Sequence, residues 1–318
     1  MRRLLLAIVL VGALVVGLVW QFGPRFGVHL VPPSPQAYAD EALRQMDAGY
    51  YAEGEEWTTA RAEAVAATRG AESYADTLPA LRKALAVAGG RHSHLFDAGQ
   101  TLASVDTERP LPEVRSSDGI TTLVVPKLSA DDESFANTYA ATLSDGIVAS
   151  KHTTTCGWIV DARNNHGGNM YPMLAGLSPL LTDGTVGGFV DRNGTQTELT
   201  INGGKALVGS DQIFSVADHP KITQPVAVLQ GPDTASSGEM VVLAFKGQQN
   251  ARSFGVPTAG LSSANQTSTL YDNTMMLLTV AVDTDRTGAT YGGPIRPDTE
   301  AGPDNAAQAA RTWLQSQC

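Results

Sequence analysis

The spacing of apolar residues predicts helices in the first third of the chain. Apolar side chains recur three or four residues apart in three segments, 36–50, 55–69 and 78–88. This is the pattern of helices that bury one face against a core. A glycine follows each of the last two segments, and glycine commonly ends a helix. We therefore predict a small helical subdomain over residues 36–95.

After Gly119 the pattern changes to short apolar runs that alternate with amphipathic segments. The apolar runs at 120–125, 156–161 and 226–229 predict buried strands, and the segment 132–150 predicts a helix. Strands that alternate with helices indicate a layered α/β domain. We place this domain at residues 96–318.

The same patterns predict four further elements. The polar segment 98–118 carries two prolines and is predicted to be an irregular, mobile flap. A hairpin is expected at 189–201 around Arg192-Asn193-Gly194, and a strand at 275–282. The last element is a helix over 306–314 that Asp304 would cap.

A serine pair lies at a strand-to-helix turn, in the sequence Thr234-Ala235-Ser236-Ser237-Gly238-Glu239. A helix start leaves backbone N–H groups free to bind negative charge. One interpretation is that Ser236 or Ser237 only caps the helix, because serine is a favoured N-cap residue. The other is that one serine is an acyl-transfer nucleophile that faces an oxyanion site.

Two other segments carry candidate chemistry. The strand ending at Asp161 leads into Gly167-Gly168, where backbone N–H groups can approach a substrate closely; a simple tight turn is the alternative. His92 and His94 follow the third predicted helix. Histidine is the usual base for a serine nucleophile, although a surface or capping role is the plainer interpretation of His92. On a strand the two histidines would face one side, but no acidic or cysteine cluster nearby completes a metal site.

Taken in order, these segments resemble the tail-specific (C-terminal processing) serine protease family, in its branch of tricorn core proteases and interphotoreceptor retinoid-binding proteins. The resemblance covers roughly residues 36–317 and rests on five elements: Gly90-Arg91-His92-Ser93, Asp161 to Gly168, Thr234 to Glu239, Gly255-Val256-Pro257-Thr258-Ala259-Gly260 and Pro294 to Asp298. It implies a crotonase/ClpP-like layered α/β core behind the helical subdomain.

The resemblance also implies roles for single residues. Ser236 would be the nucleophile, His92 the base, and the N–H groups of Gly167 or Gly168 and of Ser237 the oxyanion site, with no cofactor and no metal. Ser–Lys members of the family carry a lysine where this chain has Leu261, so that lysine is not the base here. Tricorn-like members orient the relay with a late glutamate, and the matching stretch 288–293 has no acid. Ser93, Glu239, Asp283 and Asp285 are the supporting candidates; an incomplete relay is the alternative.

The N-terminus and the cysteines bear on location. Arg2 and Arg3 precede an apolar run to Trp20, which predicts a signal peptide or an uncleaved membrane anchor over residues 1–21, followed by a proline-rich linker over 22–35. Either outcome places the enzyme domain outside the cytoplasm, anchored or secreted. Two cysteines, Cys156 and Cys318, are then free to form a disulfide or to stay as thiols.

The net charge of −10 argues against a nucleic-acid partner. The sequence therefore predicts a serine endopeptidase that acts on extended or unfolded polypeptides. A catalytically weak relative that binds an apolar ligand or a peptide is the alternative. An acyl-CoA enzyme of the crotonase type fits the export-type N-terminus and the serine turn less well.

Overall fold

The computed structural model describes residues 31–100, 107–129 and 132–318. Within them the chain forms two compact units. The first comprises residues 31–100 together with Gln266–Leu278, and the second comprises the remaining described residues. The predictions for residues 1–21 lie outside the described part. Among the helices of the described residues, none is both long and apolar enough to span a membrane.

The first unit is a helical bundle with a short strand pair. Its elements are α2 (Pro35–Met46), α3 (Gly54–Ala67), α4 (Tyr74–Gly89), the 3₁₀ turn η2 (Gly90–His92) and β1 (His94–Leu95). The helices bury the apolar face that the spacing predicted, including Leu43, Leu81 and Leu85. His92 and His94 do not lie on one strand, because His92 ends the 3₁₀ turn and only His94 pairs with β12.

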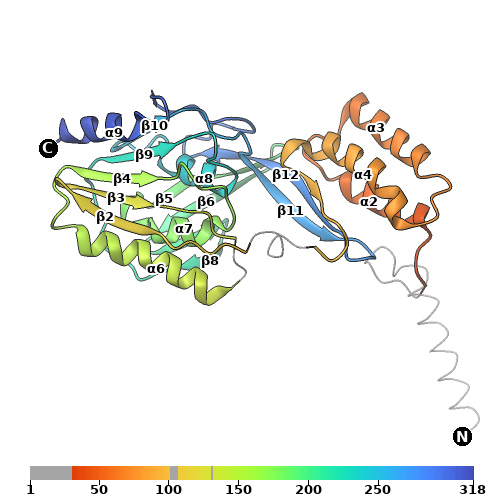
Figure 1. Cartoon of the computed structure of the whole chain (residues 1–318), viewed down its shortest axis with the longest axis horizontal. Coiled ribbons are helices and arrows are strands. Elements are labelled where there is room, and N and C mark those ends of the chain that lie inside the picture. Colours follow the sequence, from red (N-terminus) through yellow and green to blue (C-terminus); the bar gives the residue numbers. More distant parts are fainter. Residues whose placement is uncertain (1–30, 101–106, 130–131) are drawn as a thin grey trace, which may run out of the picture. The chain divides into compact units, whose positions relative to one another are not determined.

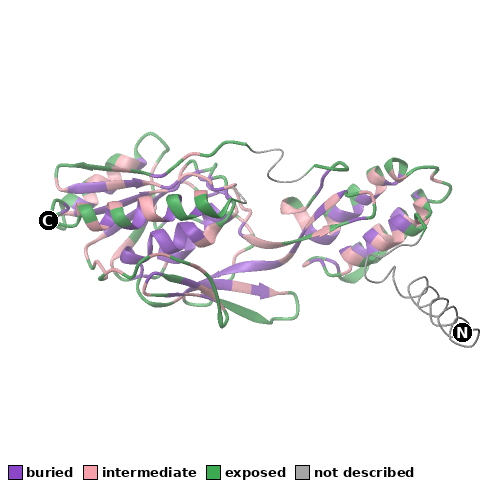
Figure 2. Ribbon diagram, turned by 90° about the horizontal axis from the view of Figure 1, so that it is seen from below, coloured by how far each residue is buried: buried purple, intermediate pink, exposed green. Residues whose placement is uncertain are grey.

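A six-stranded sheet forms the centre of the second unit (Figure 1). Its strands, in spatial order, are β13 (Thr299–Glu300), β10 (Ala251–Gly255), β9 (Val226–Gln230), β4 (Gly157–Asp161), β3 (Ile120–Val124) and β2 (Glu113–Ser117). All neighbours are parallel except β2 and β3. The apolar runs predicted to be buried strands are confirmed. β4 and β9 occupy the middle of the sheet, and all of their residues except Asp161 are buried; buried residues are purple in Figure 2.

Helices cover both faces of this sheet, as Figure 1 shows. On one face lie α6 (Glu133–Ser150), α7 (Met170–Gly176) and α8 (Ser237–Phe245), whose apolar side chains form the main core with Trp158, Val160 and Val228. On the other face α9 (Ala306–Gln315) packs against Ile159, Ala227 and Leu229. Alternate residues of each strand therefore feed opposite cores, as the pleat of a sheet requires.

A second, antiparallel sheet completes the unit. Its strands are β5 (Gly184–Asp191), β6 (Gln196–Asn202), β7 (Lys205–Val208) and β8 (Asp211–Ser215), with the later part of β12 (Met275–Asp285) beside β5; η3 (Ser178–Leu180) precedes them, and β11 (Ser263–Thr269) pairs with β12. The predicted hairpin is confirmed as β5 and β6, and the late strand as β12.

Two sequence-based expectations are corrected. The segment expected to be an irregular flap contains β2, which pairs along its whole length with β3. The cap position of the last helix is Asn305, not Asp304, and no side-chain bond caps it.

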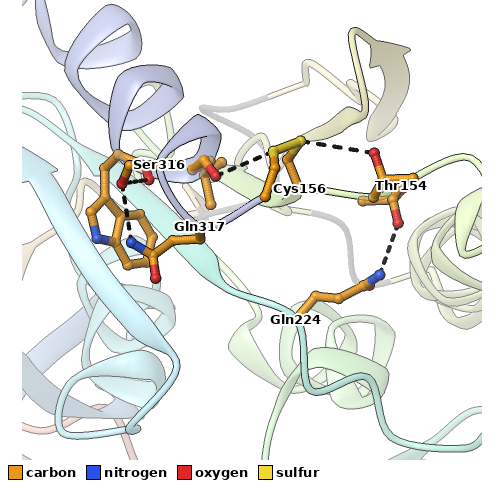
Figure 3. The surroundings of a disulfide bond; sticks show 9 residues. Thr154, Cys156, Gln224, Ser316 and Gln317 are labelled. Carbon is orange, nitrogen blue, oxygen red and sulfur yellow. Dashed lines mark hydrogen bonds between the residues drawn. A yellow bond between two sulfur atoms is a disulfide. The ribbon is translucent and has the colours of Figure 1, made fainter.

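A disulfide joins Cys156, next to β4, to Cys318 at the end of the chain, with 4.6 Å between the two Cα atoms (Figure 3). It closes a loop with a sequence separation of 162 residues. The bond fastens the end of α9 to the sheet that the helix covers.

Candidate functional site: a serine turn beside a glycine turn

Ser236 lies between β9 and α8 with its backbone in the left-handed region, at φ 53° and ψ −120°. A non-glycine residue in such a conformation is strained by about 1–3 kcal/mol and is commonly found at functional sites. Its N–H donates to Oε2 of Glu239 at 2.9 Å. Ser236 is half-buried, whereas Ser237 is buried, so Ser236 is the more accessible hydroxyl of the pair.

The turn after β4 lies against this serine. Gly167 and Gly168 have φ values of 108° and 105°. A Cβ on Gly168 would lie 2.1 Å from the carbonyl oxygen of Leu128, and one on Gly167 would lie 2.9 Å from Cβ of Ser236. Only glycine fits either position, because both the backbone angle and the space exclude a side chain.

Asn165 ties the two turns together. Its backbone carbonyl accepts from the N–H of Ala235 at 2.9 Å, and its side-chain Oδ1 accepts from the N–H of Gly167, also at 2.9 Å. A further bond runs from the Thr234 hydroxyl to the carbonyl of Ala162 at 2.9 Å. In the sequence, Asn165 and Thr234 stood out only as members of motifs of the family that the chain resembles. The spacing of these motifs does not predict the hydrogen bonds that the two residues make.

Among the described residues, two backbone N–H groups at this junction have no hydrogen-bond acceptor. The N–H of Gly167 is taken by Asn165, but within the described residues nothing accepts from the N–H of Gly168 or of Ser237. The Ser237 hydroxyl donates to the carbonyl oxygen of Gly168, which fixes one donor residue directly to the other. Gly168 is exposed, so a bound substrate has access to this donor.

Glu239 is fully buried and joins two segments, the Ser236 turn and residues 258–261. Besides the Ser236 N–H, its carboxylate accepts from the Gly260 N–H at 3.0 Å, the Leu261 N–H at 2.7 Å and the Thr258 hydroxyl. Burial raises the pKa of Glu239, and these hydrogen bonds oppose that shift. Thr258 was not singled out from the sequence except as part of its motif.

The other acidic candidates differ from each other. Asp283 is buried, and burial together with the nearby Glu239 charge raises its pKa well above the usual range. For Asp285, burial acts to raise the pKa, but hydrogen bonds from Thr287 and Tyr291 outweigh it and lower the pKa. Asp285 thus serves the turn that follows β12.

His92 and Ser93 belong to the first unit, whereas Ser236 and the two glycines belong to the second. His92 is half-buried, and burial lowers its pKa to about 4. A histidine with this pKa is neutral at pH 7 and can accept a proton. That it meets Ser236 stays a prediction. Across the described residues, no group of three or more His, Cys, Asp or Glu side chains is placed to hold a metal ion.

The chain is similar in sequence to several known proteins. The profile of peptidase family S41 matches residues 129–301. A nisin-resistance protein of Lactococcus lactis subsp. lactis is 36% identical over 319 residues, which cover 99% of this chain and 98% of that protein. The carboxy-terminal processing protease CtpA of Bacillus subtilis (strain 168) is 27% identical over 154 residues, 46% of this chain and 29% of its own length.

Solved structures show the same fold. A lipoprotein from Streptococcus agalactiae superposes with a TM-score of 0.79 at 29% identity, covering 92% of this chain and 99% of that chain. A photosystem II D1 C-terminal processing protease superposes with a TM-score of 0.59 at 15% identity, covering 86% and 94%. The second likeness is one of fold alone.

Proposed function

The chain belongs to peptidase family S41 and is a serine peptidase, and on this premise we propose that Ser236 is its nucleophile. The motifs predicted a tail-specific serine protease with a layered α/β core, and both expectations are confirmed. The choice of Ser236 over Ser237 is supported by exposure and by bonding. Ser237 is buried and its hydroxyl is committed to Gly168, whereas the strained turn presents Ser236.

The oxyanion of the tetrahedral intermediate would be held by the N–H groups of Gly168 and Ser237. This assignment is supported by the absence of an acceptor for either group among the described residues. Gly167 is the weaker candidate because Asn165 already accepts from it. Each such donor is worth about 3–4 kcal/mol of transition-state stabilisation in serine proteases.

His92 would take the proton from Ser236 and pass it to the leaving amine. The peptide bond is cleaved, an acyl-enzyme forms on Ser236, and water then hydrolyses the ester by the same proton path in reverse. His92 can fill the role because its imidazole is neutral at pH 7, although burial, which lowers its pKa to about 4, makes it a weaker base than an exposed histidine. The position that is lysine in Ser–Lys relatives is Leu261, and its N–H donates to Glu239.

Among the supporting candidates, Glu239 would act on the backbone of the nucleophile. Its carboxylate accepts four hydrogen bonds, one of them from the Ser236 N–H. Such a fully engaged carboxylate orients the turn that carries the nucleophile. We assign Asp285 no part in the reaction, since its side-chain hydrogen bonds all lie within the 285–291 turn.

We place the enzyme outside the cytoplasm, anchored to the membrane or secreted. The Cys156–Cys318 disulfide supports this, because disulfides persist in oxidising compartments. The basic and apolar N-terminal segment agrees with export, and a similar structure is described as a lipoprotein.

The substrate would be an extended polypeptide, and the name of the 36% identical relative makes nisin the first candidate to test. A binding role without cleavage is the competing function. It predicts that Ser236 does not react.

A serine-directed fluorophosphonate probe separates the two functions. We expect the full-length chain to be labelled, the Ser236→Ala variant not to be labelled, and the Ser210→Ala variant to be labelled like the parent, since Ser210 is an exposed loop serine. Casein and nisin, followed by mass spectrometry, then report cleavage. If folded protein is not labelled and neither polypeptide is cut, the peptidase assignment of Ser236 fails.

A further inference from the structure

The outer face of the six-stranded sheet carries a cavity that the proposed catalytic site does not use. Its volume is about 220 Å³, room for roughly seven water molecules at about 30 Å³ each. It lies where α9 leaves part of the sheet uncovered, since α9 packs on β9 and β4 while β2 and β3 extend beyond it. Thr122 is opposite Arg115 on β2 and beside Ile159 on β4, so the three side chains share this face.

The lining of the cavity is cationic in a chain of net charge −10. Arg115, Arg163 and Arg311 line it, with Asp161 as the one acid. Arg163 is held by Asp161 through two hydrogen bonds of 2.9 and 2.7 Å, and Arg115 pairs with Glu113 outside the cavity. Within the described residues the guanidinium of Arg311 has no hydrogen bond and no carboxylate partner, although it is half-buried.

The hydroxyl of Thr122, a lining residue, does not add a second donor to the cavity. The hydroxyl oxygen of Thr122 is buried from solvent and has no hydrogen-bond partner in the described structure. A buried polar group without a partner is unfavourable by about 1–3 kcal/mol. Because this oxygen has no solvent-accessible surface, a ligand in the cavity does not reach it, and Thr122 lines the cavity through its other atoms. The free donors offered to the cavity are therefore those of the Arg311 guanidinium.

The remaining lining is apolar and consists of Val124, Ile159 and Leu229. From these features we propose that the cavity binds an apolar group that carries a carboxylate. The planar guanidinium of Arg311 matches a carboxylate in a two-bond geometry. The aliphatic side chains contact the apolar part of the ligand. A phosphate ion has no such part and would leave this region of the cavity unfilled.

Two sources present this chemistry: the free C-terminal residue of a polypeptide and a small free acid. The volume fits one amino-acid residue. Binding at this site requires no reaction at Ser236, so it stands or fails independently of the proposed peptidase activity.

The test is an NMR titration of the ¹⁵N-labelled full-length chain with N-acetyl-leucine. Its amide, N-acetyl-leucine amide, removes the charge, and inorganic phosphate removes the apolar group. We expect saturable binding of the acid and none of the amide. Arg311→Gln should raise the Kd about tenfold or more. Arg296→Gln is the matched control, because Arg296 is an exposed arginine away from the cavity, and it should leave the Kd unchanged.

Several results would overturn the proposal: no saturation with the acid, equal binding of the amide, an Arg311→Gln variant that binds like the parent, or phosphate binding as tightly as the acid. Folding of each variant is checked by its thermal midpoint. A pentapeptide ending in free leucine identifies the source: binding that depends on Arg311 assigns a polypeptide terminus, and binding of N-acetyl-leucine alone assigns a small acid.

Discussion

Replacement of Glu239 tests how the serine turn is held. In the folded chain its Oε2 accepts from the N–H groups of Ser236 and Leu261, and its Oε1 accepts from the Gly260 N–H and the Thr258 hydroxyl. A glutamine keeps one oxygen and replaces the other by an NH₂ group. The side chain will place that NH₂ group toward Thr258, whose hydroxyl can reverse and accept, and only the Gly260 N–H then loses its acceptor.

The magnitudes follow from this count. One buried N–H without an acceptor destabilises the fold by about 1–3 kcal/mol, so Glu239→Gln should lower the free energy of unfolding by that amount. Glu239→Ala removes the acceptor for three N–H groups, those of Ser236, Gly260 and Leu261, and should cost at least about 3 kcal/mol. Because the serine turn then loosens, and a 1 Å misplacement can lower a rate about 100-fold, we expect labelling of Ser236 to slow by about that factor in the alanine variant and by less than tenfold in the glutamine variant.

Urea unfolding gives the stabilities, and the rate of fluorophosphonate labelling gives the reactivity of Ser236. Glu63→Ala is the matched control, because Glu63 is an exposed helical glutamate on α3, and it should change stability by less than about 0.5 kcal/mol. Equal effects of glutamine and alanine at position 239, or normal labelling in the alanine variant, would refute the role assigned to this carboxylate.

Three further predictions concern pH and the disulfide. Because burial lowers the pKa of His92 to about 4, the acid limb of the kcat/KM profile should have its midpoint near pH 4; a midpoint near 6.5 would contradict a buried base. Burial raises the pKa of Asp283, so its carboxyl group binds a proton more tightly in the folded state than in the unfolded state. The contribution of Asp283 to the free energy of unfolding therefore falls as the pH rises above about 4, the pKa of an unfolded aspartate. In urea titrations at pH 5 and pH 8, Asp283→Asn should lose less stability between the two than the parent does. Reduction of Cys156–Cys318, with its 162-residue separation, should lower the unfolding free energy by roughly 5 kcal/mol, because the unfolded chain gains conformational entropy. A loss below about 1 kcal/mol would contradict this reasoning and would mean that the unfolded, reduced chain remains compact.

Sequence patterning predicted the interior of the fold better than its edges. The apolar runs of β4 and β9 could be assigned because both faces of a central parallel strand are buried. The edge strand β2 could not, since in Glu113–Ser117 only Val114 is even half-buried. Backbone hydrogen bonds to β3 hold β2 in place, and such bonds cannot be predicted from the pattern of hydrophobic residues.

The same limit applies to the site. Ser236 and the glycine pair could be located because the sequence itself shows two adjacent glycines and a serine between a predicted strand and a predicted helix. The hydrogen bonds of Asn165 could not be predicted. One donor, the Gly167 N–H, lies on the same loop as Asn165, and the other, the Ala235 N–H, lies on a turn 70 residues further along the chain. Glu239 was predicted as a possible partner of the histidine. Three of its four hydrogen bonds come from residues 258–261 and depend on the folded path of that segment.

The strained backbone of Ser236 explains why the site draws on separate strands. Its left-handed conformation is unfavourable by about 1–3 kcal/mol, and each net hydrogen bond contributes only about 1 kcal/mol. One local bond to Glu239 is therefore too little, and the bonds of Ala235 to Asn165 and of Thr234 to Ala162 supply the rest. Both of these join the β9 turn to the β4 turn, so they exist only when the two strands are paired. It follows that the reactive conformation of Ser236 appears only in the folded unit, and that local opening of the β4–β9 pair should abolish labelling before the rest of the fold is lost.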